Sequence, residues 1–122
     1  MTFEERKAQV KFYLGKEINI EIARPIGFVH KKEKYSLEYK INYGFIPGVL
    51  GGDGEELDVY LLGVSEPVER YHCRVIAMVH RENDVEDKLI AAPVGMTFTK
   101  NQVAEAVNFQ EQYYKTYIEM VE

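Results

Sequence analysis

Three carboxylates, Asp53, Glu55 and Asp58, stand close together in one glycine-rich stretch of the sequence. Carboxylates held a few ångströms apart oppose one another's ionisation, so such a group either faces open water or surrounds a cation. The glycines on either side of Asp53 allow the backbone to bend tightly there. Two interpretations therefore compete for this turn: a solvated surface loop and a metal site.

Short carboxylates on a tight turn suit Mg²⁺, which takes a few protein oxygens and accepts water and phosphate oxygens as its other ligands. Asp53 and Asp58 would be direct ligands, and Glu55 could reach a metal-bound water as general base. The reaction class favoured is transfer of a phosphoryl group to water. On spacing alone the solvated alternative stays open, because acidic glycine turns are common on protein surfaces.

Phosphoryl transfer also needs groups that hold a charged phosphate, because positioning and charge neutralisation supply most of the catalysis. The candidate cations and neutral donors are Lys31, Lys32, Lys34, Arg81, Lys88 and Lys115, with Tyr39 and Tyr43. Several of them belong to a basic, irregular segment at residues 24–40. This segment contrasts with the acidic turn that follows it.

Two strands are expected to position the acids. Residues 17–22 alternate between isoleucine and polar residues, so Glu21 lies on the polar face of a half-buried strand. In residues 57–63, the apolar side chains at alternate positions share one face, which directs Asp58 to the opposite face.

Helices are expected at both ends of the chain. Thr2 with Glu5 forms a capping box that begins a short N-terminal helix. Thr99 with Gln102 forms a second capping box, and apolar residues recur at helical spacing through residues 103–121. This pattern predicts one long C-terminal helix packed on the sheet.

Residues 74–80 and 88–94 are apolar runs joined by a charged connection, which predicts an antiparallel hairpin. Because no βαβ units alternate along the chain, the elements predict a mainly β (α+β) fold, a small barrel or curled antiparallel sheet with helical cover. We expect one domain over residues 1–122.

The composition excludes several classes of function. The chain has 122 residues and a net charge of −5, so a nucleic-acid backbone would be repelled. No apolar run approaches the roughly 20 residues needed to cross a bilayer, and the first residues lack signal-peptide features. We therefore expect a cytoplasmic protein. The lone Cys73 is expected to be a buried, inert thiol.

Two motifs make the sequence recognisable. Tyr39, the run Asn-Tyr-Gly-Phe-Ile-Pro at 42–47 and the box Asp-Gly-Glu-Glu-Leu-Asp-Val at 53–59 resemble the signature of soluble family I inorganic pyrophosphatases. The similarity continues into residues 88–93 and 109–115 and covers most of the chain from about residue 17 onward. The resemblance implies an OB-like barrel, Mg²⁺ dependence, hydrolysis of pyrophosphate to two phosphates, and homo-oligomeric assembly.

The resemblance also assigns roles to individual residues. The implied metal ligands are Asp53, Asp58, Glu86 and Glu21, and an insertion or deletion in the charged connection would bring Asp84 or Asp87 to the position of Glu86. The implied phosphate-binding residues are Lys31, Tyr43, Lys88, Tyr113 and Lys115, the last with a shift of one residue from Tyr114. The implied catalytic residues are Glu55, Asp58 and Tyr43, with Glu55 in place of the aspartate that helps to activate water.

The chain departs from the family pattern in three places. The stretch between Glu21 and Tyr39 is shorter, and the missing part is a hairpin that carries a phosphate-binding lysine. Glu55 is one methylene longer than aspartate, and Arg81 stands where a metal-binding aspartate is expected. We therefore expect a divergent site with fewer metals. Two alternatives remain: hydrolysis of another small phosphoanhydride or phosphate ester, and a non-catalytic OB-type binding module.

Overall fold

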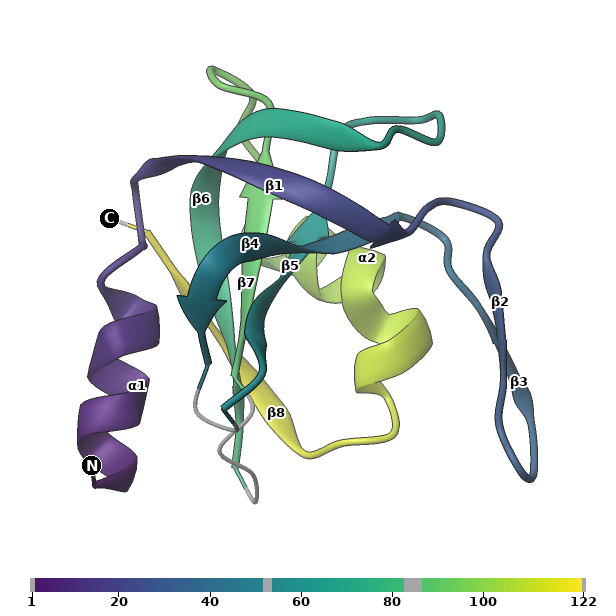
Figure 1. The fold of residues 1–122 in the computed structure, drawn as a ribbon, viewed down its shortest axis with the longest axis horizontal. Coiled ribbons are helices and arrows are strands. Elements are labelled where there is room, and N and C mark those ends of the chain that lie inside the picture. Colours follow the sequence, from purple (N-terminus) through teal and green to yellow (C-terminus); the bar gives the residue numbers. More distant parts are fainter. Residues whose placement is uncertain (1, 52–53, 83–86, 122) are drawn as a thin grey trace.

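A computed structural model of the protein describes residues 2–51, 54–82 and 87–121. Its elements in chain order are α1 (Phe3–Lys11), β1 (Glu17–Arg24), β2 (Val29–Lys31), β3 (Ser36–Glu38), β4 (Asn42–Leu50), β5 (Glu56–Leu61), β6 (Arg70–Arg81), β7 (Lys88–Ala92), α2 (Lys100–Glu111) and β8 (Thr116–Met120). Five strands close into a barrel in the order β1-β4-β5-β7-β6, because β1 also pairs with β6 (Figure 1). The predicted mainly β barrel is confirmed.

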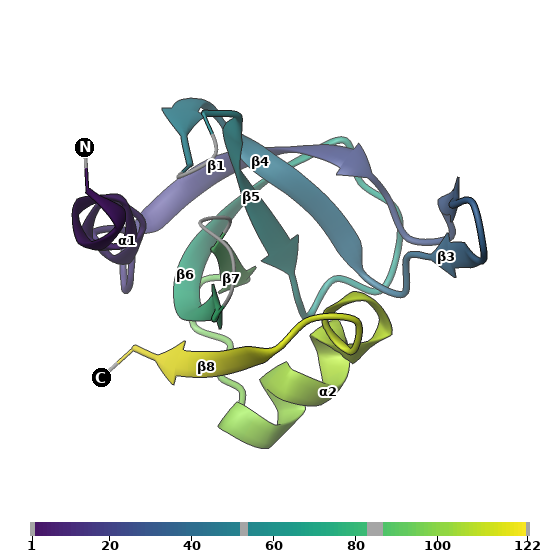
Figure 2. The same cartoon turned by 90° about the horizontal axis from the view of Figure 1, so that it is seen from below.

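The barrel has an apolar interior and one apolar outer face. The interior is filled from all five barrel strands, by residues that include Ile18, Ile20, Ile46, Leu57, Val59, Val75 and Leu89. The outer cluster packs Tyr43, Tyr60 and Ile90 against Val103 and Val107 of α2. Figure 2 shows α2 and β8 together on one side of the barrel. Cys73 lies in the interior cluster, and burial raises the pKa of its thiol to about 12, which agrees with an inert role.

Both predicted helix starts are confirmed, but the predicted length of the second helix is wrong. The side chain of Thr2 accepts from the backbone N–H of Glu5, and Thr99 and Gln102 form the complete capping box. However, α2 ends at Glu111, and β8 pairs antiparallel with β6. The β-branched and aromatic side chains at the start of β8 suit a strand, and β6 offers an edge for pairing. No helix among the described residues is long and apolar enough to cross a membrane.

The strand pairing differs from the prediction at two points. The hairpin of β6 and β7 is antiparallel as predicted, but β5 and β7 pair in parallel, so the barrel is mixed. The segment at residues 24–40, predicted to be irregular, contains the antiparallel hairpin of β2 and β3. Figure 1 shows this hairpin standing apart from the barrel.

Gly44 allows β1 and β4 to approach closely. A Cβ atom at this position would lie 1.9 Å from the carbonyl oxygen of Glu21, a contact that no side chain permits. The next pair in the register, Glu21 opposite Phe45, is therefore held close, and Phe45 in turn lies opposite Asp58. This glycine belongs to the motif at 42–47 that the sequence singled out.

Candidate active site

Lys88, Asp58 and Tyr43 form a hydrogen-bonded cluster on the side of the barrel that carries α2. The Nζ atom of Lys88 lies 2.8 Å from Oδ2 of Asp58 and 2.6 Å from Oη of Tyr43. The side chain of Lys88 is 2% exposed, whereas that of Asp58 is 28% exposed. The cluster therefore presents a carboxylate to solvent and holds a buried cation behind it.

The strands determine this arrangement. Asp58 lies between Leu57 and Val59, whose side chains fill the barrel interior, so Asp58 points to the other face as predicted. Because β5 runs parallel to β7 with Val59 opposite Leu89, Asp58 and Lys88 lie next to each other. The charge pair thus follows from strand register between segments that are distant in the chain.

Tyr43 contributes a neutral hydroxyl. Burial raises its pKa well above the ordinary value of a tyrosine, and the neighbouring Lys88 opposes only part of this effect. The hydroxyl therefore stays protonated over the whole neutral range. It accepts from Lys88, and its own proton is hydrogen-bonded to Asp58, which also raises its pKa.

One further predicted acid, Glu21, lies on the same face of the sheet as Asp58. Glu21 is opposite Phe45, and Phe45 is opposite Asp58, so the three side chains share one face of the sheet. Two strand spacings, about 10 Å, separate Glu21 from Asp58. Glu55 is exposed in the turn that leads into β5.

Three predicted phosphate-binding residues are exposed. Lys31 lies on β2. The ring of Tyr113 stacks on Tyr35 at 4.7 Å between centroids, which joins the β2–β3 hairpin to the segment after α2. Lys115 forms an ion pair with Glu82 at 3.4 Å, with its side chain 74% exposed. Their role in phosphate binding stays a prediction.

Arg81, where the resemblance led us to expect an acid, forms a closed ion pair with Glu111. Its Nη2 lies 2.8 Å from Oε2 and its Nε lies 3.1 Å from Oε1, and the two side chains are 3% and 4% exposed. The hydroxyl of Tyr60 donates to Glu111 at 2.5 Å, and the guanidinium lies 3.7 Å from the ring centre of Tyr114. This arrangement ties β5 and β6 to the end of α2.

The predicted acids that the structure describes have the donor chemistry of a magnesium site. Asp58, Glu21 and Glu55 offer hard carboxylate oxygens, which Mg²⁺ prefers. Within the described parts of the chain, no group of three or more acidic, histidine or cysteine side chains is close enough to hold a metal ion. The predicted ligands Asp53 and Glu86 lie outside the described residues.

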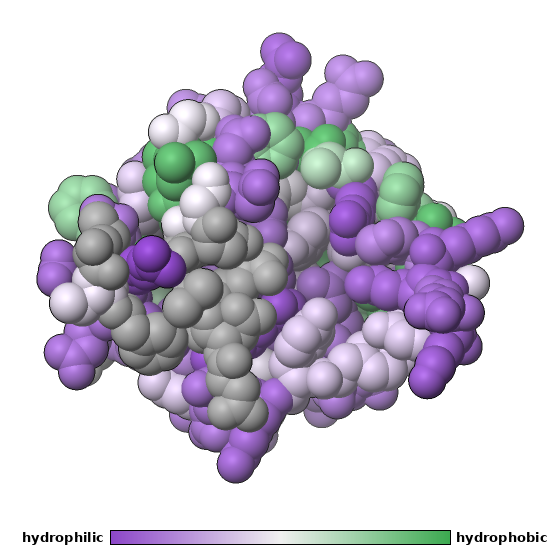
Figure 3. All heavy atoms as spheres, turned by 60° about the horizontal axis from the view of Figure 1, so that its bottom comes forward, coloured by the Kyte–Doolittle hydropathy of each residue, from purple (hydrophilic) through white to green (hydrophobic). Residues whose placement is uncertain are grey.

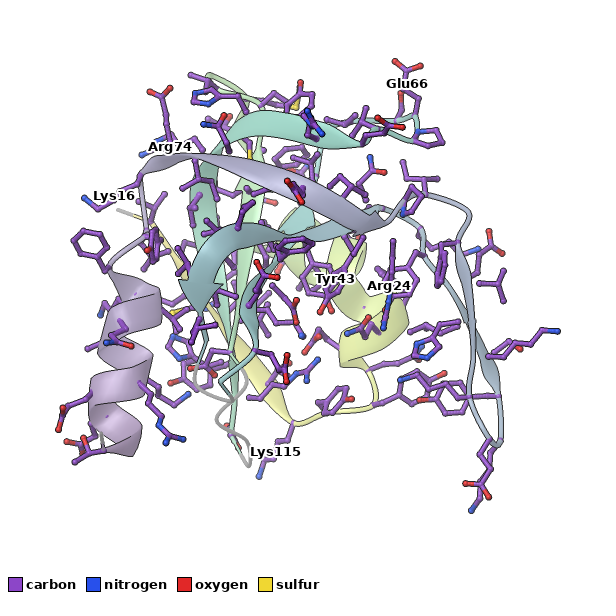
Figure 4. The ribbon with its side chains drawn as sticks, viewed as in Figure 1. Lys16, Arg24, Tyr43, Glu66, Arg74 and Lys115 are labelled. Carbon is purple, nitrogen blue, oxygen red and sulfur yellow. The ribbon has the colours of Figure 1, made fainter. Side chains whose placement is uncertain are left out.

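Sequence reasoning did not assign a role to Arg24, which the structure places beside Tyr43. Its guanidinium carbon lies 5.9 Å from the ring centre of Tyr43, and Figure 4 shows the two side chains close together near α2. Strand alternation gave no signal for this position, because it would direct Arg24 inward together with Ile22. Figure 3 brings the bottom of Figure 1 forward and shows that the surface seen from there is mainly hydrophilic.

The fold and the Lys88–Asp58–Tyr43 cluster together define the class of protein. It is a closed, mixed β-barrel that carries a lysine, an aspartate and a tyrosine on the side covered by α2. Comparison with known sequences then identifies the family. The sequence profile of the inorganic pyrophosphatase family matches residues 8–120, and the chain belongs to this family.

Individual relatives agree with the family match. The chain is 29% identical over 100 residues to an inorganic pyrophosphatase of Rickettsia prowazekii, covering 78% of this chain and 58% of the relative. It is 36% identical over 86 residues to one of Aquifex pyrophilus, covering 65% of this chain and 48% of the relative. The chain therefore spans about half the length of the curated relatives that it matches.

Solved structures show the same fold. The inorganic pyrophosphatase of Ehrlichia chaffeensis matches with a TM-score of 0.67 at 21% identity, covering 88% of both chains. That of Coxiella burnetii matches with a TM-score of 0.61 at 19% identity, covering 87% of this chain and 85% of the other. At sequence identities of 21% and 19%, the structural similarity shows that the chain shares the barrel fold of these proteins.

Proposed function

We propose that the protein hydrolyses inorganic pyrophosphate to two phosphates and uses Mg²⁺ as cofactor. The observation that carries this proposal is the Lys88–Asp58–Tyr43 cluster, in which a buried cation and a neutral hydroxyl lie behind a partly exposed carboxylate. Such a set can hold a phosphate oxygen and a cation at the same time. Membership of the inorganic pyrophosphatase family supports the same reaction.

The side chains have separate roles in this proposal. Lys88 orients Asp58 through their 2.8 Å contact and adds positive charge next to the phosphate. Tyr43 donates its hydroxyl proton to a phosphate oxygen. Glu55 takes the proton of the attacking water, as a general base on an exposed turn. The exposed residues proposed to bind the outer phosphate oxygens are Lys31, Tyr113 and Lys115.

The proposed ligands of Mg²⁺ are Asp53, Asp58, Glu86 and Glu21. When bound, the metal would supply charge neutralisation for the substrate and acidify a water molecule. Glu21 and Asp58 share one face of the sheet, so a metal ion bound by these acids would lie on that face.

A second candidate function is hydrolysis of another small phosphoanhydride or a phosphate ester. The Arg81–Glu111 pair favours it, because a position expected to hold a metal ligand is instead closed by a buried ion pair. A site with fewer metal ligands would neutralise less substrate charge, and a substrate with fewer charges would then fit it better.

Release of phosphate from pyrophosphate, with and without Mg²⁺, tests the proposal. We expect Asp58→Asn to lower the rate by roughly 100-fold or more, because it removes the charge at the centre of the cluster. Glu66→Gln is the matched control, since Glu66 is exposed and Figure 4 shows it at the opposite end of the barrel. Its rate should equal that of the unchanged protein.

The other outcomes separate the alternatives. Release from nucleotides but not from pyrophosphate would reject the first function in favour of the second. If neither substrate reacts and Mg²⁺ leaves the thermal stability unchanged, the protein is a binding module. We also propose a cytoplasmic location and a homo-oligomer, the latter measurable by analytical ultracentrifugation.

A further inference from the structure

An irregularity in β1 turns Arg24 toward the candidate site. Ile22 lies opposite Gly44 and Arg24 lies opposite Tyr43, so β1 has one more residue, Ala23, than β4 at this point. Such a bulge changes the face to which the following side chain points. Arg24 therefore lies on the side of Tyr43 and not in the barrel interior, where uninterrupted alternation would place it.

Two tyrosines hold the guanidinium of Arg24. Its central carbon lies 5.4 Å from the ring centre of Tyr39 and 5.9 Å from that of Tyr43. Its Nη1 donates to the hydroxyl of Tyr39 at 2.5 Å. No carboxylate in the described ranges forms an ion pair with Arg24, although its side chain is half-buried. A cation that is partly desolvated and has no acidic partner gains most when an anion binds.

The surroundings of Arg24 connect it to the Lys88–Asp58–Tyr43 cluster. Burial raises the pKa of Tyr39, the hydrogen bond from Arg24 opposes this, and the charges of Lys88 and Asp58 act on the same hydroxyl. Tyr39 thus lies within electrostatic reach of both Arg24 and the cluster. Burial and the charge of Arg24 also lower the pKa of His30, on the neighbouring hairpin. The positive charge of Arg24 therefore lowers the pKa of two neighbouring groups, the hydroxyl of Tyr39 and the imidazole of His30.

We propose that Arg24 is a phosphate-binding residue of the candidate site and holds the phosphate that lies farther from Asp58. Its guanidinium offers two parallel N–H donors, the geometry that suits two oxygens of one phosphate. This assignment rests on the proposed function and adds a residue from β1 to it. It also supplies a cation near the shortened segment, where the exposed Lys31 was the sequence-based candidate.

Binding of methylenediphosphonate, a pyrophosphate analogue that cannot be hydrolysed, tests the role of Arg24 in the presence of Mg²⁺. By titration calorimetry, Arg24→Gln should raise the Kd roughly tenfold or more, because charge-assisted hydrogen bonds to the phosphonate are lost. Arg24→Lys should give an intermediate Kd, because it keeps the charge without the paired donors.

The control is Arg74→Gln. Arg74 is also a half-buried arginine, and its Nε donates to the carbonyl oxygen of Gly15. Figure 4 shows it away from Arg24 and Tyr43. This variant should bind the analogue like the unchanged protein. Equal weakening by both variants would overturn the proposal.

Tyr39→Phe separates ligand binding from a purely structural role of Arg24. This variant removes the hydroxyl that Arg24 contacts but keeps the ring and the cation. If Arg24 acted only by fixing Tyr39, the two substitutions would weaken analogue binding equally, and the proposal would fail. We expect a smaller effect from Tyr39→Phe, with thermal unfolding curves showing that both variants are folded.

Phosphate release from pyrophosphate, measured in parallel, distinguishes this inference from the proposed function. If the unchanged protein hydrolyses pyrophosphate but Arg24→Gln binds the analogue within about twofold of it, only the role of Arg24 is rejected. If analogue binding weakens as expected and no hydrolysis occurs, the role of Arg24 is supported and hydrolysis is rejected. An unchanged protein that does not bind the analogue overturns the role of Arg24.

Discussion

The Lys88–Asp58 and Arg81–Glu111 pairs use similar chemistry in two different settings. Each joins a buried cation on β6 or β7 to a carboxylate, and a tyrosine hydroxyl completes each cluster. In the first pair the carboxylate side chain is 28% exposed, whereas in the second it is 4% exposed. The Lys88 pair is therefore open to a ligand, and the Arg81 pair is closed.

This difference shows which charges can take part in chemistry. Both oxygens of Glu111 accept from Arg81, and one of them also accepts from Tyr60, so its bonding capacity is used within the protein. Asp58 accepts from Lys88 at Oδ2 and is hydrogen-bonded to Tyr43, but its side chain keeps part of its surface in water. We infer that the closed cluster anchors α2 and that the open cluster binds substrate.

Arg81→Met provides the strongest test of the closed cluster. It would leave Glu111 buried without its cation, so we expect a loss of about 3–5 kcal/mol in the free energy of unfolding. Urea denaturation measures this loss. Adding Glu111→Leu to the same chain should recover part of it, because the unpaired charge is then gone. Equal stability of Arg81→Met and the unchanged protein would contradict the anchoring role.

Lys88→Met tests the open cluster. Water can reach Asp58, so the loss of unfolding free energy should be smaller than for Arg81→Met. The rate of phosphate release should instead fall roughly 100-fold, because the fixed positive charge beside the phosphate is removed. The comparison fails if Lys88→Met destabilises the fold as much as Arg81→Met does, or if it leaves the rate unchanged.

Alkaline pH gives the smallest effect and compares the two tyrosines. Burial raises the pKa of both Tyr43 and Tyr60, so each contributes stability that is complete below about pH 10 and is lost as the pH rises toward the raised folded value. Glu111 raises the pKa of Tyr60 further, whereas Lys88 lowers that of Tyr43.

Urea unfolding at several pH values between about 8 and 11 measures this dependence. Tyr43→Phe and Tyr60→Phe should each flatten the alkaline decline, because the folded protein keeps both hydroxyls protonated across this range while the unfolded chain loses their protons from about pH 10. A slope that either variant leaves unchanged would mean that folding does not raise the pKa of that tyrosine.

Local patterns in the sequence predicted much of the fold. Alternation in residues 17–22 and 57–63 identified β1 and β5 and the outward direction of Asp58, and both N-cap residues, Thr2 and Thr99, lie where the sequence places them. Helical spacing misled the prediction beyond Glu111, because the same apolar residues pair with the edge of β6 as a strand. The spacing of apolar residues along the chain does not show which strand of the sheet has an unpaired edge that another strand can join.

The sequence by itself determined which residue types the site could use, because motifs and alternation act over a few neighbouring residues. Only the tertiary structure decided their partners. Lys88 meets Asp58 and Tyr43, which are 30 and 45 residues away, and Arg81 meets Glu111, 30 residues away. These contacts depend on strand register, on one bulge in β1 and on where α2 ends. Each of these is fixed by long-range packing, which no local pattern records.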